Sequence, residues 1–119
     1  MKQLDNTKRA ANKDEAILLR RAHSDTAPLG ENIEVILNAK SWGRASNLLC
    51  YFEEITTGKL FTLSVFKNKK GYGDKADMVD FSEVGNVGNN YLLNITKSPR
   101  AKFPQLANAE LYKLLNQNN

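Results

Sequence analysis

From Ile33 onward, apolar residues recur at every second position of the chain. The apolar positions hold Ile33, Val35, Leu37 and Ala39, and the positions between them hold Glu34, Ile36, Asn38 and Lys40. This alternation predicts a strand with one face in a core and the other toward solvent, and it places Lys40 with the polar set. If the strand lies at the edge of its sheet, it could pair with a second copy in a homodimer.

Further strand patterns follow. Leu48–Ile55 and Leu60–Phe66 are rich in aromatic and branched residues, and the turn signal 56–59 between them predicts a hairpin. Met78–Phe81 is a short strand candidate, and Tyr91–Thr96 alternates again. Residues 67–77, with four lysines, predict an exposed loop.

The last segment has two interpretations. Residues 103–108 favour a short strand, whereas Ala107, Leu111, Leu114 and Leu115 have helical spacing. We expect a short strand followed by a helical turn or two, and a disordered tail at 116–119.

The N-terminal part has a different character. It is charged and polar, and Asn12 with Glu15 has capping-box spacing, which predicts a helix over about 12–23. The sequence thus divides into a charged arm with a short helix (1–30), a β-rich domain (31–115) and the tail. The predicted fold is mainly β, a small antiparallel barrel or curled sheet with an N-terminal and a short C-terminal helix.

Length and composition limit the number of domains, the kind of partner and the expected location. The 119 residues suffice for one domain, with 41% hydrophobic residues and a net charge of +4 that mildly favours anionic partners. A lone cysteine cannot form an intramolecular disulfide, which suits a reducing compartment. With no apolar run long enough to span a membrane and no apolar stretch typical of a secretory signal, the expected location is the cytoplasm.

Catalytic chemistry has few candidates. His23 is the only histidine and is expected to be solvated at the helix end, and Cys50 is expected to be a small buried hydrophobe. Asp74, Asp77 and Asp80 recur at every third position, but lysines interrupt them, which favours a solvated loop over a metal site. We therefore expect no enzyme, no metal and no cofactor.

Basic and aromatic residues lie close together in three places. The groups are Lys40, Trp42 and Arg44; Phe66, Lys67, Lys69, Lys70 and Tyr72; and Lys97, Arg100, Lys102 and Phe103. Cations track phosphates and aromatic faces stack on bases, so the combination is typical of single-stranded nucleic-acid binding. The predicted groove contains Trp42, Arg44, Phe66, Lys67, Lys69, Lys70, Tyr72, Arg100 and Lys102.

Two stretches, 58–66 and 88–98 followed by Leu106–Ala109, carry a resemblance over roughly 75 residues. Their strand pattern resembles the OB-fold single-stranded-DNA-binding proteins of phages and plasmids, and the second stretch resembles the final hairpin of those proteins. The resemblance implies a five-stranded, partly open barrel that binds oligonucleotides on one face. The connector from Pro99 to Pro104 departs from the pattern and puts barrel closure in question.

Three functions follow as hypotheses. The first is a non-enzymatic protein that binds single-stranded nucleic acid, DNA or RNA. The alternative is a small mobile-element protein that binds and inhibits a host protein complex, of the anti-CRISPR kind. The third is a metal-dependent nuclease that uses Asp74, Asp77 and Asp80.

Overall fold

A computed structural model describes residues 12–45, 47–67, 71–72, 79–83, 86–100, 102 and 104–111, with 105–111 described by their backbone. Within this part the elements are, in chain order, α1 (Lys13–Ala22), β1 (Gly30–Trp42), β2 (Leu48–Glu54), β3 (Leu60–Val65), β4 (Asn90–Thr96) and β5 (Gln105–Leu111). The mainly β fold with an N-terminal helix is confirmed.

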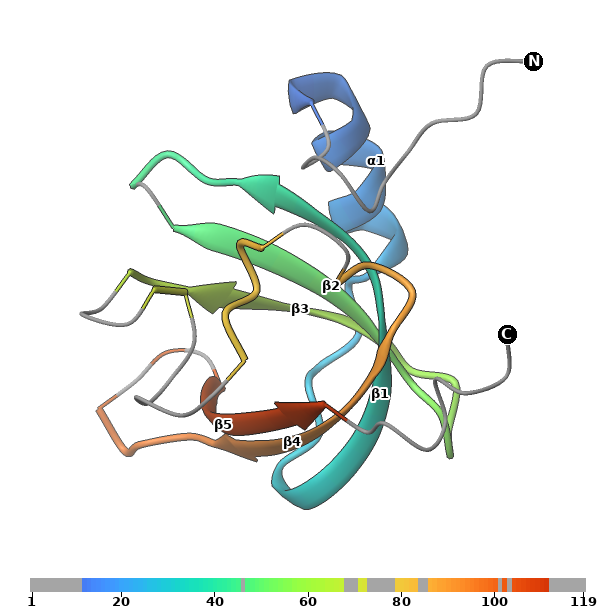
Figure 1. Ribbon diagram of the computed structural model, residues 1–119, viewed down its shortest axis with the longest axis vertical. Coiled ribbons are helices and arrows are strands. Elements are labelled where there is room, and N and C mark those ends of the chain that lie inside the picture. The colour runs from blue at the N-terminus through green and yellow to red at the C-terminus, as the bar shows by residue number, and fades with distance from the viewer. Residues whose placement is uncertain are drawn as a thin grey trace.

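The described strands form one antiparallel sheet in the order β3-β2-β1-β4-β5. The sheet curls, so its two edge strands, β3 and β5, approach each other on the side opposite β1 (Figure 1). The hairpin predicted at 56–59 is confirmed: Gly58, with a φ of 76°, closes the turn by donating to the Glu54 carbonyl at 2.8 Å. A glycine fits there because a side chain disfavours that backbone conformation.

β1 is the central strand of the sheet. Its second half pairs with β2 and its first half with β4, so it has hydrogen-bonded neighbours on both sides. The expectation that residues 33–40 form an edge strand open to a second copy is therefore wrong.

A bulge interrupts β1 at Asn38. Leu37 pairs with Phe52, but the next pair is Ala39 with Tyr51, so one residue of β1 has no partner in β2. Because of this extra residue, the side chains that follow Asn38 in β1 point to the opposite face from the one that simple alternation predicts. Lys40 consequently points to the core side, opposite Cys50, and its side chain is buried. The placement of Lys40 on the solvent face is wrong for this reason.

The core lies inside the curl. Its buried apolar side chains come from β1, β2, β3 and β4 and, outside the sheet, from Ala27 and Phe81. Phe81 is fully buried against Phe52 and Tyr91. Burying a phenylalanine contributes about 1.5–3 kcal/mol. The strand expected at 78–81 is wrong over residues 79–81, because Asp80 accepts from the Ser82 amide and forms a turn there. Met78 is outside the described residues.

Helix α1 packs against the outer face of the sheet. The capping box is confirmed, with reciprocal 2.8 Å hydrogen bonds between Asn12 and Glu15. His23 caps the C-terminal end and is buried: Nδ1 donates to the Leu19 carbonyl at 2.8 Å, and Asn38 donates to Nε2 at 3.2 Å. The expectation of a solvated histidine is wrong, because the helix end folds back onto the sheet beside Tyr51.

The C-terminal segment is a strand through Leu111, paired with β4 along its length. Helical spacing of Ala107 and Leu111 does not produce a helix there, since the backbone groups of 105–111 find partners on β4. The helical turn expected after residue 108 is wrong over 109–111, which continue the strand, and its remainder lies outside the described residues. In the part of the chain that is described, no helix is long and apolar enough to cross a membrane.

Candidate nucleic-acid interface

Three segments that are far apart in sequence lie at the same end of the curled sheet. The β1–β2 loop (43–47), the end of β3 with residues 66–67, and the β4–β5 loop (97–104) all lie at the left of Figure 1. The β2–β3 turn lies at the opposite end. We call the first end the loop-end surface; its described members from the predicted groove are Trp42, Arg44, Phe66, Lys67, Tyr72, Arg100 and Lys102. Lys69 and Lys70 lie outside the described residues.

Trp42 ends β1 and keeps 52% of its side chain exposed. It pairs with Leu48, a core residue, so it stands on the core side of the sheet where the sheet ends. Its ring meets that of Tyr72 edge to face, with centroids 5.1 Å apart and an interplanar angle of 78°. Tyr72 is half-buried and packs against the core. Trp42 therefore has a supported side and an open side.

Phe66 follows β3 and is 60% exposed. Leu48 of β2 pairs with Trp42 of β1 on one side and with Val65 of β3 on the other. Phe66, which follows Val65, is therefore separated from Trp42 by β2 and lies at the same end of the sheet. The intervening β1–β2 loop is held to β3 because Asn47 donates to the Ser64 hydroxyl at 2.5 Å. Gly43 allows this, since a Cβ there would lie 2.2 Å from the Asn47 side chain.

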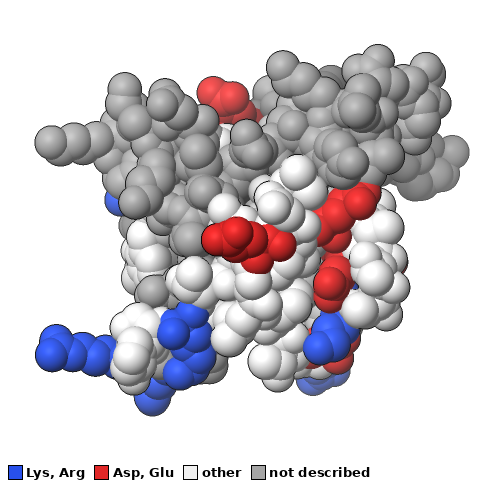
Figure 2. All heavy atoms as spheres, turned by 90° about the horizontal axis from the view of Figure 1, so that it is seen from below, with Lys and Arg blue, Asp and Glu red and all other residues white. Residues whose placement is uncertain are grey.

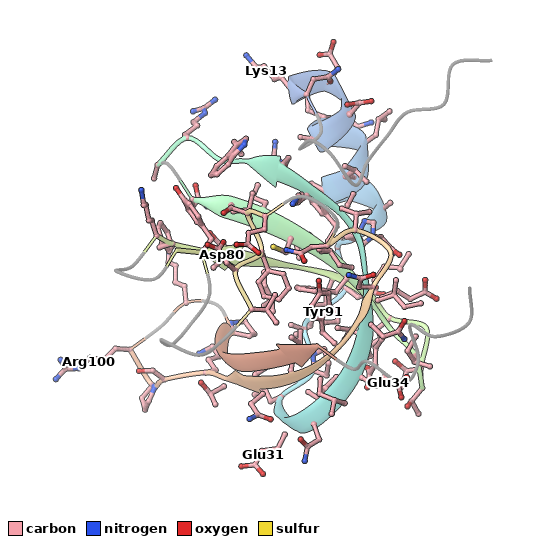
Figure 3. The ribbon with its side chains drawn as sticks, viewed as in Figure 1. Lys13, Glu31, Glu34, Asp80, Tyr91 and Arg100 are labelled. Carbon is pink, nitrogen blue, oxygen red and sulfur yellow. The ribbon has the colours of Figure 1, made fainter. Side chains whose placement is uncertain are left out.

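Charge is distributed unevenly between the two ends. Arg44, Lys67, Arg100 and Lys102 are exposed at the loop end. Arg100 projects from the β4–β5 loop, far from Glu34 at the other end (Figure 3). Seen from below, basic atoms lie at the left, loop-end side with no acidic atoms among them, whereas at the right basic atoms lie beside acidic ones (Figure 2). This distribution favours an anionic partner at the loop end.

Lys40, named with the first basic group, does not join this surface. It is 4% exposed, and its Nζ donates to the carbonyls of Phe81 and Glu83 at 3.0 and 2.8 Å. Burial lowers the pKa of Lys40, while Cys50, Asp80 and Glu83 oppose that change. The ammonium group is used inside the protein and cannot reach a phosphate.

Asp80, the one described member of the aspartate trio, is also used internally. It accepts from the Tyr72 amide and from the amide and hydroxyl of Ser82. Burial raises its pKa, but these hydrogen bonds and nearby Lys40 outweigh burial and lower it overall. Among the residues described, no three His, Cys, Asp or Glu side chains converge on a metal position. Asp74 and Asp77 are outside the described residues.

The other catalytic candidates, Cys50 and His23, have surroundings that fit a structural role. Cys50 is fully buried, as predicted, and burial raises its pKa to about 12. His23 has both ring nitrogens in hydrogen bonds with Leu19 and Asn38. The roles of Lys40, Asn47 and Asp80 were not predicted from the sequence. Only the role of Asp80 could have been predicted, because the Asp-x-Ser pattern of residues 80–82 is typical of a turn closed by the aspartate side chain.

Comparison of the chain with protein-family models, with curated proteins and with solved structures finds no match.

Proposed function

We propose that the protein binds single-stranded nucleic acid at the loop-end surface. The observation that carries the proposal is the exposure of Trp42 and Phe66 at the same end of the sheet as four exposed cations of the predicted groove, Arg44, Lys67, Arg100 and Lys102. Large aromatic side chains exposed beside arginine and lysine supply stacking and phosphate contacts together. Each stacked base contributes about 1–3 kcal/mol.

We also propose that the chain is an OB-like domain. The curl of the five described strands, and the approach of β3 to β5, support this proposal. OB-folds bind oligonucleotides through the loops that join strands 1 to 2 and 4 to 5 and through the face of strands 2 and 3. Arg44 comes from the first loop, Arg100 and Lys102 from the second, and Phe66 follows the third strand.

The test is fluorescence anisotropy with a labelled single-stranded oligonucleotide at low salt. Trp42→Ala and Phe66→Ala are each expected to weaken binding by about 5- to 150-fold, the equivalent of one lost stacking contact. Ile55→Ala, which removes an exposed apolar side chain at the opposite end, is the matched control and should bind like the parent protein. Absence of binding by the parent protein at low salt would refute the proposal.

A second function, binding and inhibition of a host protein complex, is favoured by a different surface. Helix α1 leaves Leu18 64% exposed and Ile17 41% exposed, although both are apolar. Exposed apolar side chains on a helix are typical of protein contacts. Capture of a stoichiometric protein complex from nuclease-treated host lysate, lost in Leu18→Asp but kept in Trp42→Ala, would favour this function over nucleic-acid binding.

A further inference from the structure

Lys40 is an unusual residue for the interior of a small β domain. A buried ammonium group is costly unless its donors have partners, and here two carbonyl oxygens, of Phe81 and Glu83, accept from it. Both acceptors belong to the segment 79–83, which lies outside the sheet, whereas Lys40 lies within β1. Lys40 therefore ties this segment to the central strand.

Asp80 ties the same segment to Tyr72. Its Oδ1 accepts from the Tyr72 amide at 3.1 Å, and the Phe81 amide donates to the Tyr72 carbonyl at 3.2 Å. The backbone of Tyr72 is thus held at both its N–H and its C=O by residues 80 and 81. The approach is close enough to require Gly71: a Cβ there would lie 1.8 Å from Asp80, and φ is 122°.

Tyr72 in turn supports Trp42 through the edge-to-face ring contact at 5.1 Å. A continuous path of contacts leads from buried Lys40 through the 79–83 segment and Tyr72 to Trp42. Each step is a hydrogen bond or a ring contact between described residues. The path ends on the exposed aromatic side chain nearest to the β1–β2 loop.

We propose that Lys40 and Asp80 are positioning residues for Trp42: they fix the 79–83 segment and Tyr72, and Tyr72 holds the Trp42 ring ready to stack on a base. This inference rests on the proposed function for its purpose, but the positioning itself can be measured without ligand. A ring that is already ordered loses less freedom on binding, so its affinity for a base is higher.

The experiment uses the intrinsic fluorescence of Trp42, the only tryptophan of the chain, excited where tyrosine does not absorb. In Asp80→Ala and Tyr72→Leu, we expect lower anisotropy of Trp42 and stronger quenching by acrylamide, because the ring moves more freely. Affinity for a labelled single-stranded oligonucleotide should fall by about three- to tenfold, as expected when one side chain must be ordered on binding.

The controls separate positioning from other effects. Tyr72→Phe keeps the supporting ring and should leave the anisotropy of Trp42 unchanged, whereas Arg44→Ala should weaken oligonucleotide binding without changing that anisotropy. Lys59→Ala, in the distant β2–β3 turn, should change neither. Circular dichroism verifies folding, and Asp80→Asn, which keeps one acceptor oxygen, gives a smaller effect of the same sign if Asp80→Ala does not fold.

The outcomes are distinguishable. Unchanged Trp42 anisotropy in folded Asp80→Ala and Asp80→Asn would overturn the positioning role, even if oligonucleotide binding were weakened. If the parent protein binds no oligonucleotide but the anisotropy falls in Asp80→Ala, the proposed function fails, whereas the coupling of Asp80 to Trp42 stands.

Discussion

Alkaline pH should destabilise this protein through one buried thiol. Cys50 is fully buried, and burial raises its pKa from 9.0 to about 12, although nearby Lys40 acts in the opposite direction. Because the folded-state pKa lies above the unfolded-state value, the stabilisation is fully present below pH 9.0 and is lost as the pH rises toward 12. In the unfolded chain the thiol can ionise freely at pH 10, but in the folded protein it cannot.

The size of the effect follows from these two pKa values. Between pH 7.5 and pH 10, Cys50 should lower the free energy of unfolding by about 1.4 kcal/mol. Urea unfolding at both pH values measures this change in the parent protein and in Cys50→Ala. The cavity left by the alanine is present at both pH values, so its effect cancels in the comparison.

The parent protein should therefore lose about 1.4 kcal/mol more stability than Cys50→Ala over this pH interval. Burial raises the pKa values of Tyr51 and Tyr91 in both proteins, and Cys50 raises them further in the parent protein, which acts in the same direction as its own ionisation. An equal loss in the two proteins would refute the reasoning. A thiol reagent gives an independent check, since native Cys50 should react only as fast as the protein opens.

Three further predictions concern the loop-end surface and its support. If the four exposed cations of the predicted groove each contact a phosphate, the logarithm of oligonucleotide affinity should fall with the logarithm of salt concentration with a slope of about −2.8, and Arg100→Ala should reduce the magnitude of this slope by about 0.7. Phe81→Ala should lower the free energy of unfolding by about 3–5 kcal/mol in urea titrations, because it empties a site between Phe52 and Tyr91. The pKa of Asp80 is lowered, so its contribution to stability is present above pH 3.8, the pKa in the unfolded chain, and is lost as the pH falls below that value. Acid titration followed by circular dichroism should therefore show a smaller loss of stability in Asp80→Asn than in the parent protein.

Much of the sheet was predictable because its signals are local. Alternation identified the strands around Ile33 and Tyr91, and the turn signal at 56–59 identified the hairpin. The capping box at Asn12 identified the helix start. In each case the residues that carry the pattern are neighbours in sequence, and tertiary packing agrees with them.

The wrong predictions concern residues whose surroundings depend on parts of the chain that are distant in sequence. The bulge at Asn38 leaves no mark in the alternation, yet it moves Lys40 into the core. His23 is buried because of Asn38 and Tyr51, which lie on strands far along the chain. Leu111 is in a strand because β4 supplies backbone partners. For the candidate site, the exposed aromatics were identifiable, but the supports of Trp42 were not.

The position of β1 has a consequence for the order of folding. β1, β2 and β3 follow one another and pair as neighbours, so this meander closes only short loops. β4 must then return to β1 from a distant part of the chain, and closing that long loop is entropically slow. The β1–β2 loop and the β4–β5 loop belong to these two separate units. The complete loop-end surface therefore requires β4 to dock on β1, because Arg100 and Lys102 come from the β4–β5 loop, whereas the meander alone supplies Trp42, Arg44, Phe66 and Lys67.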